Sequence, residues 1–417
     1  MSDRVKVAFH GGLPLSACLV MASWVLPEPA AGRGGEGRAK EISRALVTQV
    51  QRGTTASIGK ALRAYNGVER AREISDSGRH AIHRALVREL RRSDNATVAK
   101  VARSLLRRSA STSFPAQVVV LKAVARSTGE VAEKALVDLF VGAAKHKDRR
   151  LATWAVRLFA ETRSAAAIDV LIDLLAAEER SGRYFGDLAS VIQGELYRVL
   201  GSIATGDAYS IKKSWEKAGK KIPKKPDYNV DGAAGGGGKT VFFGDRLSTR
   251  AVFCIDISSS MKGEVKTGKG AAAPKVDIVK GELEKAVGGL TPENRFNIIA
   301  YDGKCSPWRD PGKLLRGSRS VVTAGKAYAR SLQTGSGTNI HDAMVAGLAV
   351  SGVETIYLLS DGAPSVGGNP DQVRQRVGAL NYLRGVRVVT YGFAGSDEKL
   401  MRDLAHSHWG WYRALND

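Results

Sequence analysis

Apolar residues recur at the spacing of an α-helix through the first half of the chain. The clearest runs are Val98, Val101, Ala102 and Leu105, and then Ala152, Val156, Leu158 and Phe159. Polar turns separate these runs, and Asp94 and Asp148 stand where the N-cap of a following helix is expected. The pattern predicts pairs of short helices at about 95–126, 130–162 and 165–205, with further helices before them.

After residue 241 the pattern changes to short apolar runs that alternate with amphipathic segments. The apolar runs predict strands at 252–255, 296–301, 355–359, 386–391 and 409–412. The segments between them predict helices at 275–287, 321–332, 340–350, 371–383 and 397–405. Alternation of this kind is typical of a doubly wound, mostly parallel α/β sheet.

A basic and glycine-rich stretch lies between the two halves. It has four lysines and two prolines at 220–226, then a run of glycines that ends in Lys239 and Thr240. A phosphate loop is excluded because Ala233 replaces its first glycine and no apolar strand precedes it. We therefore expect four parts. They are a signal-peptide-like segment at 1–31, a helical domain at 38–221, a linker at 222–243 and an α/β domain at 244–417.

Five oxygen-bearing side chains follow the predicted strands and a Gly-rich loop. Asp256, Ser258 and Ser260 occupy alternate positions as the first strand of the sheet ends, so their side chains point the same way. Thr338 lies in the loop before a helix, and Asp361 follows another buried strand. Because oxygen ligands suit hard cations, the set predicts a magnesium site, with manganese and calcium as alternatives.

These motifs, in this order, resemble those of the von Willebrand factor type A domain with its metal-ion-dependent adhesion site. The resemblance covers about residues 244–417 and implies a mostly parallel sheet with one antiparallel edge strand. It also implies that Ser258 and Ser260 ligate the metal directly, that Thr338 does so directly or through water, and that the two aspartates act mostly through water. Ser259 stands where the family usually has glycine. The insertion at 262–274 is expected to be a disordered surface loop, with a flap that contacts a partner as the alternative.

The helical half resembles HEAT-type repeats, whose period is about 40–47 residues. Such repeats stack into a curved solenoid with a concave surface. An irregular helical bundle is the alternative interpretation. The first hypothesis for function is therefore an exported protein-interaction module. It would bind an Asp or Glu of a partner protein through the cation and offer the concave surface as a second contact.

The net charge of +22 favours anionic partners. The second hypothesis is an RNA-binding protein, because helical repeats followed by a type A domain also resemble the Ro ribonucleoprotein architecture. No Ser-His-Asp or paired-carboxylate spacing is present, and Asp302 and His341 are the nearest candidates for a catalytic base. We therefore expect no enzymatic activity. The sequence leaves the oligomeric state open.

Residues 1–31 have the pattern of a targeting segment. Arg4 and Lys6 precede an apolar run at 13–26, which is shorter than the roughly 20 residues of a membrane-spanning helix. Export to the periplasm, cell surface or medium is the first interpretation, a lipid anchor at Cys18 the second and a cytoplasmic N-terminus the third. Cys254 and Cys305, the other cysteines, show no zinc-binding spacing.

Overall fold

The computed structural model describes residues 33–108, 110–125, 130–181, 187–224, 226, 241–266 and 272–415. The targeting segment with Cys18 and most of the predicted linker lie outside the described residues. Within them, a helical region precedes an α/β part, as the sequence predicts. In the described part of the chain, no helix has the length and apolar character needed to cross a membrane.

The helical region consists of ten α-helices in its described residues, two of which have the N-caps predicted from the sequence. Asp94 accepts a hydrogen bond from the backbone N–H of Thr97 at 2.7 Å, and Asp148 accepts one from that of Arg150 at 2.9 Å, which confirms both predicted caps. The helices are α1 (Arg33–Gln51), α2 (Thr55–Val68), α3 (Asp76–Leu90), α4 (Asn95–Leu106), α5 (Ala110–Val124), α6 (Glu130–Ala144), α7 (Arg149–Glu161), α8 (Ala165–Arg180), α9 (Asp187–Leu200) and α10 (Ala208–Lys217).

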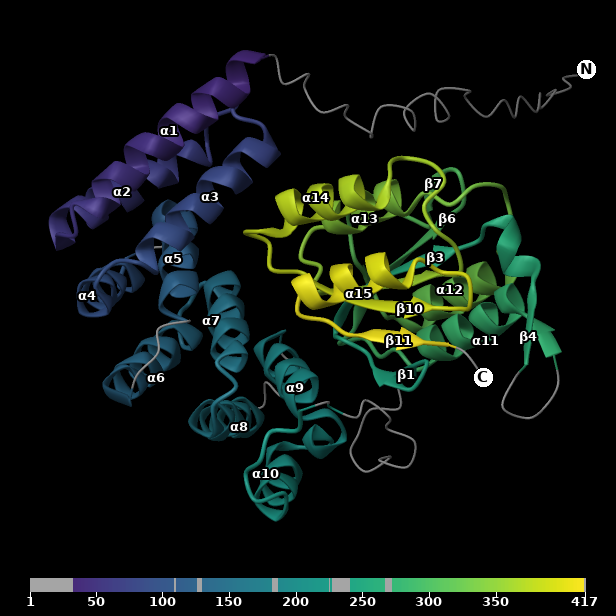
Figure 1. The fold of residues 1–417 in the computed structure, drawn as a ribbon. Coiled ribbons are helices and arrows are strands. Elements are labelled where there is room, and N and C mark those ends of the chain that lie inside the picture. The colour runs from purple at the N-terminus through teal and green to yellow at the C-terminus, as the bar shows by residue number, and fades with distance from the viewer. Residues whose placement is uncertain are drawn as a thin grey trace, which may run out of the picture.

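These helices stack in two layers. Helices α3, α5, α7 and α9 contact one another in succession, and so do α2, α4, α6, α8 and α10. Sequence neighbours such as α4 and α5 also contact each other, which joins the layers. Figure 1 shows the helices arranged in an arc along one side of the α/β part. Stacking is expected because a single helix pair cannot bury its own apolar face.

The α/β part is built on one mostly parallel sheet. Its strand order is β11-β10-β9-β3-β6-β7, with β7 antiparallel at one edge and β8 paired to β6. The strands are β3 (Arg250–Asp256), β6 (Arg295–Tyr301), β7 (Cys305–Pro307), β8 (Leu315–Arg316), β9 (Thr355–Ser360), β10 (Arg387–Gly392) and β11 (Tyr412–Ala414). The helices are α11 (Lys275–Gly288), α12 (Arg319–Ser331), α13 (Ile340–Ala349), α14 (Pro370–Asn381) and α15 (Glu398–Ser407).

Both faces of this sheet are apolar, which explains the continuous hydrophobic runs in the sequence. Alternate residues of β3 belong to two different cores. Phe253 and Ile255 pack in the cluster that includes α11, whereas Val252 and Cys254 pack in the cluster that includes α13, α14 and α15. The sheet is therefore held between two layers of helices, as predicted.

Three stretches differ from the sequence-based expectations. Residues 241–243, assigned to the linker, belong to the α/β part: β1 (Val241–Phe242) pairs with β2 (Asp245–Arg246), and Phe242 is buried against Phe253 and Tyr391. In the insertion, β4 (Glu264–Lys266) and β5 (Ala272–Pro274) form an antiparallel pair rather than an irregular loop. The last strand begins at 412 instead of 409, because Trp409 and Trp411 pack against the helical region.

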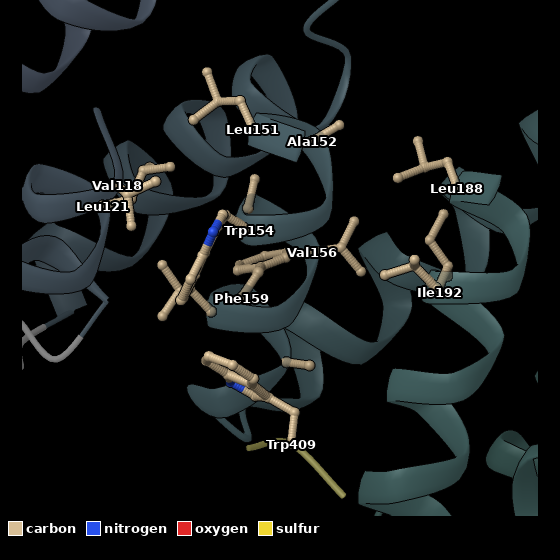
Figure 2. Packing of buried hydrophobic residues seen from close by; sticks show 14 of the residues in the cluster. Val118, Leu121, Leu151, Ala152, Trp154, Val156, Phe159, Leu188, Ile192 and Trp409 are labelled. Atoms are coloured by element: carbon tan, nitrogen blue, oxygen red, sulfur yellow. The ribbon is translucent and has the colours of Figure 1, made fainter. Parts of the chain in front are cut away.

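The helical region contacts the α/β part at the amino ends of the parallel strands. Trp154 of α7 donates to the carbonyl of Leu383 at 3.0 Å and meets Trp409 edge to face, with ring centroids 4.9 Å apart (Figure 2). The Arg157 guanidinium, also from α7, donates to the carbonyl of Glu354, just before β9. The layer of α3, α5, α7 and α9 therefore faces the α/β part, which corrects the expectation that it offers a free concave surface.

Candidate metal centre

The five predicted ligands come from three segments that meet at the carboxyl ends of two adjacent strands. Asp256 ends β3 and Asp361 follows β9, which pairs with β3 in parallel. Ser258 and Ser260 continue from β3 into the one-turn 3-10 helix η4 (Ser259–Lys262). Open α/β sheets bind ligands at such strand ends.

Three of these side chains lie within hydrogen-bond reach of one another, and a fourth holds the backbone between them. The Oγ atoms of Ser258 and Ser260 are 2.9 Å apart, and Ser260 donates to Oδ1 of Asp361 at 2.6 Å. Oγ of Ser258 lies 3.5 Å from the same carboxylate oxygen. The backbone N–H of Ser258 donates to Oδ1 of the Asp256 side chain at 2.8 Å. The set is therefore preorganised by its own contacts.

Thr338 is brought to this group by a loop that the end of β3 holds in place. The N–H of Gly335 donates to the carbonyl of Ile257 at 2.7 Å, and Ser258 forms an isolated parallel bridge with Gly335. A Cβ at Gly335 would collide with the Asp302 carboxylate, which would have to move to admit any other residue. The loop that carries Thr338 is thereby anchored to the end of β3.

Gly362 leaves open the space between the two groups of hydroxyls. A Cβ at this position would lie 3.5 Å from Oγ1 of Thr338 and 4.0 Å from Oγ of Ser260. The two hydroxyls thus face one volume, which a larger residue would fill. With the carboxylates of Asp256 and Asp361 they form an oxygen-only donor set, which fits magnesium, manganese or calcium.

Asp256 is fully buried, and both of its carboxylate oxygens have donors. Oδ2 accepts from the hydroxyl of Ser360 at 2.7 Å, opposite the bond from Ser258. The pKa of Asp256 is raised to about 6, mainly by burial and further by the charge of Asp361, although the bonds from Ser360 and Ser258 oppose the rise. A nearby cation would favour the ionised form.

Lys275, the first residue of α11, also reaches the site. Its Nζ lies 2.9 Å from Oδ2 of Asp361 and 3.2 Å from the carbonyl oxygen of Ala394. The two oxygens of Asp361 therefore have different partners, hydroxyls at Oδ1 and an ammonium at Oδ2. Neither Lys275 nor Ser360 was among the residues predicted for the site. No spacing signals Lys275, which reaches Asp361 across 86 residues of sequence.

The candidate bases named from the sequence are bonded elsewhere. Nδ1 of His341 pairs with the carboxylate of its neighbour Asp342 at 2.8 Å, and Oδ1 of Asp302 accepts from the N–H of Lys304 at 2.7 Å. Among the described residues, no group of three or more His, Cys, Asp or Glu side chains is arranged to hold a metal ion. A metal centre here would thus depend on hydroxyl ligands.

Comparison with curated proteins gives matches over part of the chain. This chain is similar to inter-alpha-trypsin inhibitor heavy chain H4 from Bos taurus, with 28% identity over 208 residues. The match covers 42% of this chain and 21% of that protein. It is also similar to von Willebrand factor A domain-containing protein 3B from Homo sapiens, with 29% identity over 170 residues, 40% of this chain and 12% of that protein. Most of each relative's length therefore has no counterpart in this chain. No protein-family model matches the chain.

Solved structures give low overall scores. A von Willebrand factor type A protein from Catenulispora acidiphila has a TM-score of 0.35 and 20% identity, covering 40% of this chain and 38% of that one. The RO (RSR) protein of Deinococcus radiodurans has a TM-score of 0.24 and 13% identity, covering 98% and 95%. The curated relatives, together with the strand order of the sheet, support a von Willebrand factor type A domain in the α/β part of this chain.

Proposed function

We propose that this chain is a protein-interaction module that binds an acidic group of a partner through a divalent cation. The observation that carries the proposal is the convergence of Asp256, Ser258, Ser260 and Asp361 at one strand end. Thr338 completes the proposed ligand set. Magnesium is the first candidate ion, with manganese and calcium as alternatives.

The donor set explains why the bound cation would attract a further ligand. Two carboxylates and three hydroxyls contribute only two negative charges, and Lys275 offsets part of the charge of Asp361. A divalent ion held there would keep an open coordination position, which a partner's carboxylate can occupy. The residues of the chain hold the ion and orient that position.

The placement of the site suits binding of a large partner. The helical region packs at the amino ends of the strands, near Arg387 and Glu354. Asp256 and Ser360 lie at the carboxyl ends of their strands, on the opposite side of the sheet along the strand direction. Since β3 has seven residues, about 20 Å of strand separates the two edges. A partner at the metal edge would therefore not compete with the helical region.

We propose that the helical region is a HEAT-like solenoid that acts as a scaffold. Its two-layer stacking supports this assignment. Because the layer of α3, α5, α7 and α9 holds the α/β part, the opposite layer is the one that remains for partners. If the helices did not stack at a regular repeat, the irregular helical bundle would be the better description.

We also propose that the site binds rather than catalyses. The imidazole of His341 and the carboxylate of Asp302 bond to their sequence neighbours Asp342 and Lys304, and in the described residues neither side chain is hydrogen-bonded to the five proposed ligands. A base in contact with the metal centre is therefore not part of this proposal. Export remains part of the proposal through the targeting pattern of residues 1–31. Mass spectrometry of the N-terminus of the protein from its native source tests it, and an unprocessed Met1 would contradict cleavage.

Water-proton relaxation of the Mn²⁺-loaded chain tests the proposed function. A short peptide with one glutamate should lower the relaxation enhancement by replacing a metal-bound water, whereas the same peptide with glutamine should not. The variant Asp361→Asn should lose both the enhancement and the peptide effect. Asp277→Asn, which removes an exposed carboxylate on α11, is the matched control and should behave as wild type. Equal effects of the two peptides would contradict carboxylate recognition.

One observation favours nucleic acid as a second candidate partner. Residues 33–108 contain 18 Lys or Arg against seven Asp or Glu, so this sixth of the chain carries half of the net charge of +22. Most of these cations are exposed, as Lys60, Arg63 and Arg84 are. Phosphate contacts by such a surface would give an RNA affinity that falls steeply with salt. A flat salt dependence would exclude this candidate.

A further inference from the structure

We propose that Lys275 is a built-in counter-cation of the metal centre: it lowers the affinity for the divalent ion and keeps the loaded site net positive. The inference rests on the metal-dependent function proposed above and deepens it. It concerns a residue outside the five-ligand set and therefore assigns a new role within the site.

The geometry places the ammonium on the carboxylate but apart from the hydroxyls. Lys275 contacts Oδ2 of Asp361, whereas Ser258 and Ser260 approach Oδ1. A cation bound next to the hydroxyls would therefore approach Oδ1 of Asp361, while the ammonium of Lys275 remains at Oδ2. Asp361 is fully buried and the Lys275 side chain is only 12% exposed, so water screens their interaction weakly.

The position of Lys275 is fixed by the backbone around it. Its N–H donates to the carbonyl of Gly263 at 2.9 Å, where η4 ends, and its Nζ holds the carbonyl of Ala394 after β10. The β4–β5 pair leads directly into Lys275, so the insertion after the site delivers this side chain to Asp361. This gives the insertion a structural role at the metal centre.

Lys275 changes the net charge of the loaded site. Asp256 and Asp361 together with a divalent ion would be neutral, and Lys275 makes the loaded site positive. The ammonium repels the incoming ion and already compensates Asp361 in its absence. Repulsion between the ammonium and a divalent ion several ångströms away is about 1.4 kcal/mol even in a water-like medium, which corresponds to roughly tenfold in affinity. A positive loaded site favours an anionic partner group.

Calorimetric titration with Mn²⁺ alone tests the inference on the full chain. Two neutral variants, Lys275→Met and Lys275→Gln, should bind Mn²⁺ about tenfold more tightly than wild type. Their melting temperature without metal should fall, because the buried Asp361 carboxylate loses its partner, and Mn²⁺ should raise it by more than in wild type. Lys275→Arg keeps the charge and should bind as wild type does. Lys262→Met, which removes an exposed lysine from the same segment, is the matched control.

The outcomes separate the two proposals. Equal or weaker Mn²⁺ binding by both neutral variants overturns the role of Lys275 and leaves the proposed function standing. Failure of wild type and all variants to bind Mn²⁺ overturns the proposed function itself. Tighter binding by Lys262→Met as well would show a general charge effect and would also overturn the specific role of Lys275.

Discussion

Arg387, the first residue of β10, donates a hydrogen bond to the buried carboxylate of Glu195 in helix α9 at 2.5 Å. Two more guanidinium groups, those of Arg157 and Arg198, pair with the same carboxylate at 3.5 and 2.7 Å. Burial raises the pKa of Glu195, but the three cations outweigh burial and hold this pKa below its usual value. A largely buried cluster of charged side chains thus joins the helical region to the amino end of the sheet.

Replacing Glu195 by Gln should destabilise the whole chain. The change leaves the buried guanidinium groups of Arg157 and Arg387 without their carboxylate, at a cost of about 3–5 kcal/mol. Denaturant unfolding followed by tryptophan fluorescence measures the loss, since Trp154 and Trp409 lie at this contact. The exposed change Glu216→Gln is the control and should cost less than about 0.5 kcal/mol. Similar losses for the two variants would contradict the buried cluster.

Tyr382 holds a second point of contact between the two parts. Its ring stacks on His80 and meets His83 edge to face, and its hydroxyl donates to the Glu69 carboxylate at 2.6 Å. Tyr382→Ala should cost about 3 kcal/mol and should separate the unfolding of the helical and α/β parts. Tyr382→Phe keeps the ring and should cost about 1–2 kcal/mol. Calorimetry checks both, and a single unchanged transition in Tyr382→Ala would contradict the coupling.

A directed hydrogen-bond chain runs beneath Tyr382. The ammonium of Lys122 lies 3.1 Å from Nε2 of His83, whose Nδ1 lies 2.9 Å from the Tyr65 hydroxyl, and that hydroxyl donates to Glu69 at 2.7 Å. If Lys122 donates, His83 accepts at Nε2 and carries its proton on Nδ1. Lys122 also donates to the carbonyl of Tyr382 at 2.9 Å, so the chain links both parts.

Acid should weaken this contact. Burial is the main cause that lowers the pKa of His80 and His408 to about 4 and that of Lys122 to about 7. The unfolded chain therefore binds more protons than the folded one, and stability falls as pH decreases from 6.5 to about 4 for the histidines and from 10.5 to about 7 for Lys122. Melting temperatures across this range measure the slope.

Two histidine variants locate the effect. His80→Gln removes a half-buried titrating group and should reduce the acid slope between about pH 6.5 and pH 4.5. His406→Gln changes an exposed histidine two residues from His408 and should leave that slope unchanged. An unchanged slope in His80→Gln would contradict the assignment.

Metal affinity should also depend on pH through Asp256. Because burial raises the pKa of this carboxyl to about 6, protons compete with the cation below that pH. Mn²⁺ affinity should therefore rise as pH increases from about 5 to about 7, as calorimetry in matched buffers would show. An affinity that stays constant over this range would contradict ionisation of Asp256 as a requirement for binding.

Much of the fold follows from local pattern. The runs at Val252–Ile255 and at Phe296–Tyr301 are buried on both sides, and such runs between amphipathic segments specify a parallel sheet. The convergence of Asp256 and Asp361 also follows from the sequence, because adjacent parallel strands end at the same edge. Helix caps at Asp94 and Asp148 were predictable for the same local reason.

What the sequence did not predict depends on contacts between distant segments. Trp409 was assigned to the last strand, but it packs on Trp154 of the helical region. The insertion was expected to be an irregular loop because Gly, Ala and Lys have low strand propensity, yet its ends pair. Lys275 is one of many lysines in a basic chain, and only the fold brings it to Asp361.

The most direct test of the metal centre is calorimetric titration of the purified chain with Mg²⁺, Mn²⁺ and Ca²⁺. We predict one site for at least one of these ions, lost in Asp256→Asn and in Asp361→Asn and retained in Asp277→Asn. No heat of binding from any of the three ions, or binding that survives both changes at Asp256 and Asp361, would contradict a cation held at the ends of β3 and β9.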